Sequence, residues 1–587
     1  RTGRLAYDYG DGLGRSFGFG INPAGALYLD KQKQVQHTVN AQGGLAVTLY
    51  KGLKLSVDAG LHYYNNLYSD LTNKYYGDAA GIGRLLQQST NALSFTAKEM
   101  LSYVTNIGDH NIDAAVVHEN LYYRSNYVYG YKAYLADGES LNLSNAIQMN
   151  AVEGNADGFA MDSYLARFTY SYDEKYLISA NYRADGSSRF APEHRWGIFP
   201  SVALGWKIKE TFFADNNELS EWKLRLGYGQ TGQQEGIGDY NYFASYTMGH
   251  GNRFEYPLVG DAIYRPNAYN SDLTWETTTT YNAGIDFGFW NGRLTGNIDW
   301  YYRETTDLLN TVSVAAGSNF RNQVMSNIGS LKNTGIEASL NWKAISNNDW
   351  LWDLGVNFTY NQNEITELID GDYQLTGGIS SGTGNMCQAH AVGHPAGSFY
   401  VYQQVYDNNG MPIEGAVVDR NGDGTITTAD KYLYKSPSAP WTAGFTSKLM
   451  YKNWDFSFSL RASFDNYVFN DLEAGSSNIS SSQVLAQSGY LSNRPKNVLG
   501  KAWQTYDWVL SDYFVQNGSF LKCDNITLGY TFDQLFGAKI GGRVYATASN
   551  VFTITNYKGI DPEVAGGIDN SLYPRPFTAL VGLSLNF

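Results

Sequence analysis

The chain has 587 residues, of which 15% are aromatic, and a formal net charge of −14. Its 42 basic residues are spread along the sequence without a cluster, which argues against a nucleic-acid partner. Cys387 and Cys523 belong to no CxxC or Cys/His pattern, so neither a disulfide framework nor a zinc site is expected. No apolar run approaches the roughly 18 residues of a transmembrane helix, whereas the tyrosine-rich composition favours β structure.

The first clear strand pair lies near the start of the sequence. Leu45, Val47 and Leu49 alternate with small or polar residues, a turn follows at Lys51-Gly52, and the alternation resumes up to Leu61. This two-residue period predicts strands with one apolar face. The same pattern recurs around other short turns: 164–182 around Asp173-Glu174, 281–302 around Asn291-Gly292, 336–360 around Ser346–Asp349 and 441–464 around Lys452-Asn453.

Long polar connections separate these hairpins, approximately at 231–275, 305–332, 364–440 and 465–518. Short turns on one rim and long loops on the other are typical of an outer-membrane β-barrel, in which the long loops are extracellular. A soluble β-sandwich is the alternative, but its strands are usually shorter than the alternating segments of roughly 10–13 residues found in this sequence.

The final segment, Phe577–Phe587, alternates apolar and small or polar residues and ends on an aromatic side chain. A strand of this kind is typical of the last strand of a barrel, whose outer face contacts lipid. We therefore predict an all-β fold, a transmembrane antiparallel β-barrel, with residues 1–587 forming part of one barrel domain.

The alternating segments number roughly 17, beginning near Gln36. The first and the last both run towards the periplasm, and an odd number of strands cannot close a bacterial barrel of this type. We expect further strands upstream. The opening residues RTGRLAYDYG contain neither an initiator methionine nor an apolar leader, so the sequence is expected to start inside a longer precursor.

Three stretches carry a family resemblance: Arg183–Trp206 (RADGSSRF to RWGIFPSVALGW), Leu226–Gln233 (LGYGQTGQ) followed by Asp272–Thr278 (DLTWETT), and Asn327–Glu337 (NIGSLKNTGIE). Together they closely resemble the SusC/RagA-like TonB-dependent outer-membrane transporters of Bacteroidetes. The resemblance spans about 163–587 and keeps the family order of motifs.

The resemblance implies a 22-stranded barrel whose lumen is filled by an N-terminal plug, with both the plug and the first strands absent from this sequence. It implies active import of oligosaccharides or peptides, a SusD-like surface lipoprotein, contact with TonB-ExbB-ExbD through the missing N-terminal region, and a dimer of transporter–lipoprotein pairs surrounded by outer-membrane lipid and lipopolysaccharide. A passive porin or surface-assembly channel is the first alternative. A barrel hydrolase ranks last, because no HExxH, GxSxG or P-loop motif is present, so no catalytic residues are nominated.

Polar side chains on the inner faces of the strands are expected to meet the plug or water. Arg167, Arg183, Arg225 and Asp286 are the charged examples, and we favour lumen wetting over a role in substrate binding for them. In the connections, exposed aromatic rings suit sugar stacking or peptide contact, but loop packing or docking of a partner protein is expected to account for most of them. They are Tyr240, Tyr242, Phe243, Tyr246, Phe254, Tyr256, Tyr264, Tyr269, Phe399, Tyr400, Tyr402 and Tyr406.

One motif predicts a metal site. The stretch 419–430, DRNGDGTITTAD, matches the calcium loop of EF-hand type, with oxygen ligands at the first, third and fifth positions and glycine at the sixth. The expected Ca²⁺ ligands are Asp419, Asn421, Asp423, the Thr425 carbonyl and Asp430. The alternative is a turn rich in Asp, Asn and Gly that binds nothing. Any ion bound here would rigidify a loop instead of performing chemistry.

Overall fold

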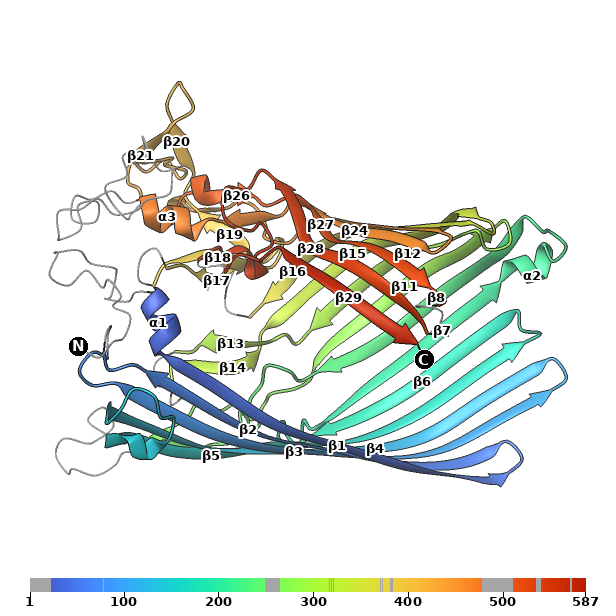
Figure 1. Ribbon diagram of the computed structural model, residues 1–587, viewed down its shortest axis with the longest axis horizontal. Helices are drawn as coiled ribbons and strands as arrows, with labels where there is room; N and C mark the ends of the chain where they lie inside the picture. Colours follow the sequence, from blue (N-terminus) through green and yellow to red (C-terminus); the bar gives the residue numbers. More distant parts are fainter. Residues whose placement is uncertain are drawn as a thin grey trace.

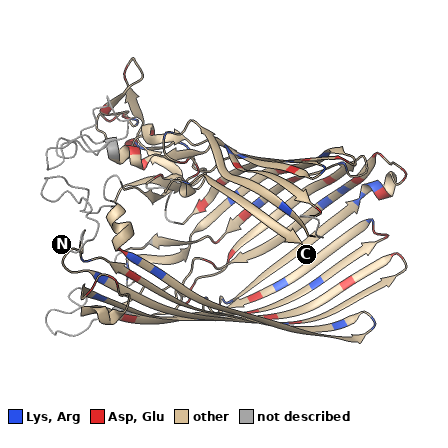
Figure 2. Cartoon of the chain, viewed as in Figure 1, with Lys and Arg blue, Asp and Glu red and all other residues tan. Residues whose placement is uncertain are grey.

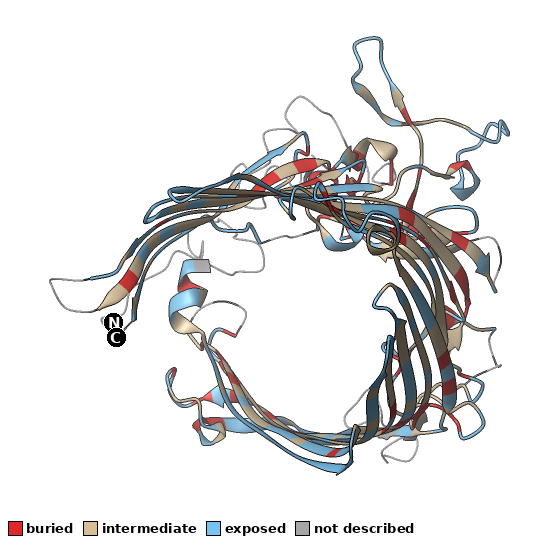
Figure 3. Ribbon diagram, turned by 90° about the vertical axis from the view of Figure 1, so that its right-hand side faces the viewer, coloured by how far each residue is buried: buried red, intermediate tan, exposed pale blue. Residues whose placement is uncertain are grey.

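The computed structural model describes residues 23–75, 77, 79–248, 264–315, 317, 319, 321–369, 371, 373–380, 384–477, 510–534, 540–570 and 573–586. Among them, 17 strands form one antiparallel sheet, which curves into a barrel wall (Figures 1 and 3). Its strands are β1 (Lys31–Tyr50), β2 (Leu53–Thr72), β3 (Arg84–Ile107), β4 (His110–Leu135), β5 (Ala146–Tyr172), β6 (Tyr176–Ser187), β7 (Trp196–Lys207), β8 (Leu219–Gln233), β11 (Glu276–Phe289), β12 (Leu294–Thr306), β15 (Gly329–Ser346), β16 (Trp350–Leu368), β23 (Trp441–Tyr451), β24 (Trp454–Phe464), β27 (Phe520–Phe532), β28 (Gly541–Thr555) and β29 (Thr578–Asn586). The all-β barrel fold is confirmed.

Each strand of the wall pairs with its neighbour in the chain, and the strands are joined mostly by short turns at one end of the wall and by longer connections at the other. The turn between β11 and β12 shows why the sequence folds this way. Phe289 pairs with Leu294, and Asn291 and Gly292 both adopt positive φ, 54° and 73°, which these residue types tolerate. The expected Asn-Gly hairpin is confirmed. The short turns gather at one end of the wall, opposite the helix α3 (Asp471–Ser477) (Figure 1).

The first five strands are longer than the sequence pattern predicts. They run for 20 to 27 residues, beyond the apolar belt, because the backbone ladder continues where the outer face becomes polar. Asn65 pairs with Asn91, and Asn91 with Asn126, and the Asn65 amide donates to Asn91 at 2.6 Å. Alternation of polarity stops there, but strand pairing does not.

The outer face of the wall is apolar. On β7, Trp196, Ile198, Val202, Leu204 and Trp206 all lie on one face and are exposed or partly exposed. Aromatic pairs lie beside the short turns, such as Trp350 with Tyr451, as the interfacial girdle of a barrel requires. No helix in the described part of the chain is both long and apolar enough to cross a membrane.

The wall has two free edges. Within the described residues, β1 pairs only with β2, and β29 pairs only with β28. The end view shows an incomplete ring with the helix α1 (Pro23–Leu29) beside the gap (Figure 3). Each edge therefore presents unpaired backbone N–H and C=O groups, which a hydrocarbon environment does not tolerate.

A second, smaller unit sits at the end of the wall that carries the long connections, and we call it the loop module (373–437, 465–477 and 510–517). Its strands are β17 (Tyr373–Gly378), β18 (Met386–Ala391), β19 (Ser398–Val401), β20 (Gln404–Tyr406), β21 (Pro412–Val417), β22 (Tyr432–Leu433), β25 (Tyr467–Phe469) and β26 (Val515–Asn517). Its own hydrophobic core is built from Cys387, Phe399, Val401, Phe469 and Phe514. The remaining short strands lie in other connections: β9 (Tyr246–Met248), β10 (Tyr264–Pro266), β13 (Leu309–Ser313) and β14 (Gln323–Asn327).

The four connections expected to be long correspond to the intervals 234–275, 307–328, 369–440 and 465–519 between wall strands. A fifth long connection, 556–577, joins β28 to β29 and was not among them. It lies at the same end of the wall as the loop module (Figure 1).

Candidate transport lumen

The inner face of the wall is polar and carries both signs of charge (Figure 2). Cross-strand partners share a face, so the register assigns each side chain to the apolar outer set or to the inner set. The four charged residues expected on the inner face are ion-paired there. Arg167 donates to Asp113 at 3.1 Å, and Arg183 pairs with Asp185 at 2.8 Å and with Glu119 at 3.2 Å.

Arg225 and Asp286, the other two, belong to the most connected of these groups. Arg225 on β8 donates to Asp286 on β11 and to Asp299 on β12, each at 2.9 Å. Asn297 also donates to Asp299, at 2.7 Å. A side chain at position 284 would collide with both Asp299 and Arg225, so Gly284 allows the network to lie flat against the wall. These charges are therefore matched within the wall.

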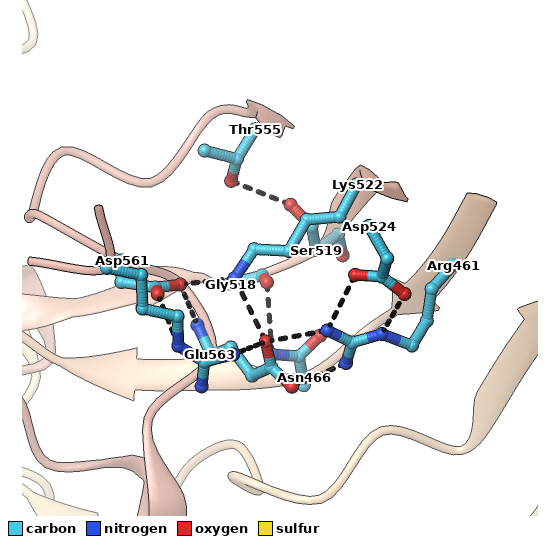
Figure 4. A network of polar contacts seen from close by, with 10 residues as sticks. Arg461, Asn466, Gly518, Ser519, Lys522, Asp524, Thr555, Asp561 and Glu563 are labelled. Carbon is cyan, nitrogen blue, oxygen red and sulfur yellow. Dashed lines mark hydrogen bonds and ion pairs between the residues drawn. The ribbon is translucent and has the colours of Figure 1, made fainter. Parts of the chain in front are cut away.

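A second network fastens the 556–577 connection to the wall (Figure 4). Lys522 on β27 is buried, and its ammonium donates to Asp561 at 2.8 Å and to Glu563 at 2.9 Å. Arg461 on β24 binds Glu563 and, at 3.0 Å, Asp524. Arg575 then contacts Asp561 at 3.2 Å and Glu563 at 2.9 Å. Basic side chains of the wall and acidic side chains of the connection thus form one continuous ion-pair network.

The pKa of Glu563 is strongly perturbed by its partners in that network. Burial alone would raise its pKa, but the hydrogen bonds from Arg461 and Lys522 outweigh burial and hold the pKa at about 2, against an ordinary value of 4.5. Its contribution to stability is therefore complete above about pH 4.5 and is lost as the pH falls towards 2. Sequence reasoning missed this site, because strict alternation on β27 would place Lys522 on the outer face with Ile526 and Leu528. Only the register shift between Cys523 and Asn525 brings Lys522 to the inner face, opposite Arg461.

The predicted calcium loop is well ordered by its own hydrogen bonds. Asp419 accepts backbone N–H groups from Gly422 at 2.7 Å and Gly424 at 2.8 Å. Asn421 accepts from Asp423, whose carboxylate in turn accepts from the Thr425 N–H at 2.8 Å. No group of three or more His, Cys, Asp or Glu side chains converges on a common metal position in the part of the chain that the structure describes.

Asp430, at the last position of the loop, has a structural role that the motif did not reveal. It is fully buried and accepts from Thr427 at 2.8 Å and Arg420 at 2.9 Å, completing a capping box with Thr427. Hydrogen bonds from the backbone, that of Thr427 first, hold its pKa below the ordinary range. Asp430 thus joins the start of the loop, at Arg420, to its end, at Thr427.

The aromatic side chains singled out in the sequence fall into different environments. Phe399 is fully buried in the core of the loop module, so it serves packing and not ligand contact. Lys431 lies over the rings of Tyr400 and Tyr402, at 5.8 Å and 5.1 Å. Exposed rings are those of Tyr240, Phe243, Tyr246, Tyr269 and Tyr406, and that of Tyr242 is half-buried. Phe254 and Tyr256 lie outside the described residues, as does the side chain of Tyr264, whose backbone belongs to β10.

A curved wall with an apolar outer face, a polar charged inner face and long connections at one end defines an outer-membrane β-barrel of the transporter type. The family model described as TonB dependent receptor-like, beta-barrel matches residues 1–571, and the chain belongs to that family. The protein is therefore a β-barrel of the outer membrane, and its relatives are receptors, not enzymes.

Two curated relatives and one solved structure are informative. The chain is 44% identical to the TonB-dependent receptor SusC of Bacteroides thetaiotaomicron, covering 96% of this chain and 57% of SusC. It is 30% identical to the TonB-dependent receptor P3 of Formosa agariphila, covering 76% of this chain and 48% of P3. The RagAB peptide transporter superimposes with a TM-score of 0.83 at 26% identity, covering 96% of this chain and 63% of that one.

The expected likeness to SusC/RagA-like receptors is confirmed by these matches. The chain spans less than two thirds of the length of each relative.

Proposed function

We propose that the whole protein imports oligosaccharides or peptides across the outer membrane, driven by TonB and ExbB-ExbD and assisted by a SusD-like surface lipoprotein. The observation that carries the proposal is the polar inner face of the wall, where Arg183 and Arg225 are ion-paired with carboxylates of other wall strands. The 44% identity to SusC supports TonB dependence, and the likeness to RagAB supports peptide as one cargo class.

The two free edges of the wall support a larger barrel. We propose that additional strands of the same polypeptide pair with β1 and β29 and close a barrel of about 22 strands, whose lumen an N-terminal plug fills. Closure satisfies the backbone groups that both edges leave unpaired. The transporter–lipoprotein pairs are proposed to associate as dimers among outer-membrane lipid and lipopolysaccharide.

The cargo is tested by growth. A strain lacking the full-length gene is compared with wild type on panels of single oligosaccharides and of peptides as the sole carbon or nitrogen source. We expect growth to be lost on members of one panel and restored by the gene together with its lipoprotein partner. Equal growth of both strains on every member of both panels would contradict import of these classes.

A passive porin is the competing function. It is distinguished by conductance of the purified full-length protein in planar bilayers, because a plugged importer keeps its lumen closed without TonB. Steady open-channel current in the wild-type protein would favour the porin.

Binding of Ca²⁺ by the loop 419–430 is a separate proposal. It is supported by the ligand spacing and by the way Asp419, Asn421 and Asp423 gather their oxygens around consecutive backbone amides. We expect Ca²⁺ to raise the melting temperature of the full-length protein and to protect the backbone amides of 419–430 from hydrogen exchange.

Asp423→Ala is expected to abolish both effects, whereas Asp407→Ala, in the neighbouring β20–β21 turn, is expected to leave them intact. Isothermal titration calorimetry that detects no Ca²⁺ binding to the wild-type protein would leave the loop as a turn that binds nothing.

A further inference from the structure

One hollow on the inner wall differs from the rest of the lumen. It has a volume of about 520 Å³ and is lined by residues of consecutive wall strands from β12 to β27, most of which belong to the inner set. Its floor is Gly355, where a side chain would collide with Thr446. Hydroxyl groups of Thr446, Ser457 and Ser459 line it. The hollow is therefore a polar recess that exists because β16 has no side chain at this point.

Three cations stand at its periplasmic side. Lys343 on β15 and Lys448 on β23 both pair in register with Asp353 on β16, three residues from the short-turn ends of their strands. Arg293, in the turn before β12, also lines the hollow, and its side chain donates to backbone carbonyls of Lys343 and Ala344. The only carboxylate among the lining residues is Asp353.

These lysines are unlike the arginines of the lumen. Arg167, Arg183, Arg225, Arg461 and Arg543 are each bonded to a carboxylate. Lys343 and Lys448 are exposed, and neither forms an ion pair within 4.0 Å with a carboxylate of the described residues. The Oδ1 atom of Asp353 is buried and makes no hydrogen bond within the described chain. The nearby Asp455 interacts electrostatically with Lys448, but its hydrogen bond, at 2.9 Å, comes from Arg543 and not from either lysine.

Any plug segment that packs against this recess displaces water from its lysines, and a desolvated ammonium group is costly unless an anion meets it. We infer that the hollow docks an acidic segment of the protein's own N-terminal region, with carboxylates of that segment bound by Lys343 and Lys448. This inference rests on the proposed function, because it requires a plug. Charge complementarity selects the occupant, since three cations face one carboxylate.

The contact is tested with a carbodiimide, which joins a lysine amine to a carboxylate only when the two touch. The purified full-length protein is cross-linked, digested and examined by mass spectrometry. We expect peptides joining Lys343 or Lys448 to aspartate or glutamate residues upstream of this chain. The Lys343→Arg/Lys448→Arg variant should lose these cross-links while it keeps the docking. Cross-links from both lysines only to residues of the barrel would overturn the inference.

A second measurement follows the docked region by hydrogen exchange. The Lys343→Glu/Lys448→Glu variant is expected to speed exchange of N-terminal amides at least tenfold, whereas the double arginine variant keeps the wild-type rates. Lys452→Glu, in the turn between β23 and β24 and outside the hollow, is the matched control and should also keep them. Equal exchange in all variants would contradict the inference.

Energised uptake by the wild-type strain is measured in parallel. Uptake without the cross-links refutes only the docking, whereas cross-links without uptake refute only the transport function.

Discussion

Replacing Lys522 with alanine is expected to release the 556–577 connection from the barrel wall. Lys522 is buried between Asp561 and Glu563, and its loss leaves two carboxylates at a site from which water is largely excluded. Removing one partner of a buried ion pair costs about 3–5 kcal/mol, and we expect the low end, about 3 kcal/mol, because Arg461 and Arg575 remain. A cost of about 3 kcal/mol corresponds to roughly 100-fold faster hydrogen exchange for amides of this connection, measured by mass spectrometry.

Lys558→Ala is the matched control, because Lys558 is an exposed lysine of the same connection. It is expected to leave exchange unchanged. If the amides of the connection exchange at the same rate in the Lys522→Ala and Lys558→Ala proteins, the charge network does not hold the connection to the wall.

Replacing Val202 with arginine is expected to impair insertion of the barrel into lipid. Val202 lies on the outer face of β7 between Trp196 and Trp206, and its side chain is 43% exposed. Arginine on the lipid-facing surface near the bilayer midplane costs about 2–4 kcal/mol. We expect a clear fall in the inserted fraction, measured by heat-modifiable migration of the full-length protein after folding into lipid vesicles.

Ala203→Arg provides the comparison, because residue 203 is the next position on the same strand and faces the lumen. Its pairing partners, Ser179 and Gly227, belong to the inner set. Insertion of the Ala203→Arg protein should stay near the wild-type level. If the inserted fraction falls equally in the Val202→Arg and Ala203→Arg proteins, the outer face of β7 does not contact lipid in preference to the inner face.

Sequence patterning was most informative inside the apolar belt. There, one face of each strand must contact lipid and the other must contact water, so polarity alternates and the strand number follows from it. Beyond the apolar belt, both faces of a strand contact water, so the polarity of its residues no longer has to alternate. This is why the extensions of β1–β5 past residues such as Asn65 and Asn91 could not be read from the sequence, although their backbone ladder is intact.

The contacts of the long connections were beyond sequence reasoning for a different reason. They depend on pairs far apart in the chain, such as Lys522 with Asp561 and Tyr432 with Asp512, for which no local pattern exists. The inner-face charges were predicted correctly by alternation, but their partners were not. The motif 419–430 marked an ordered loop, yet it did not reveal that Asp430 is buried and accepts hydrogen bonds from the backbone of Arg420 and Thr427.

The most direct test of the central claim measures the initial rate at which cells take up a labelled cargo identified by the growth panels. The rate is compared between a strain with functional TonB and an otherwise identical strain without it, both producing the full-length protein and its lipoprotein partner. Active import predicts accumulation against a gradient in the first strain, and a rate at the background of the gene-deletion strain in the second. Equal uptake with and without TonB would contradict the account and identify a passive channel.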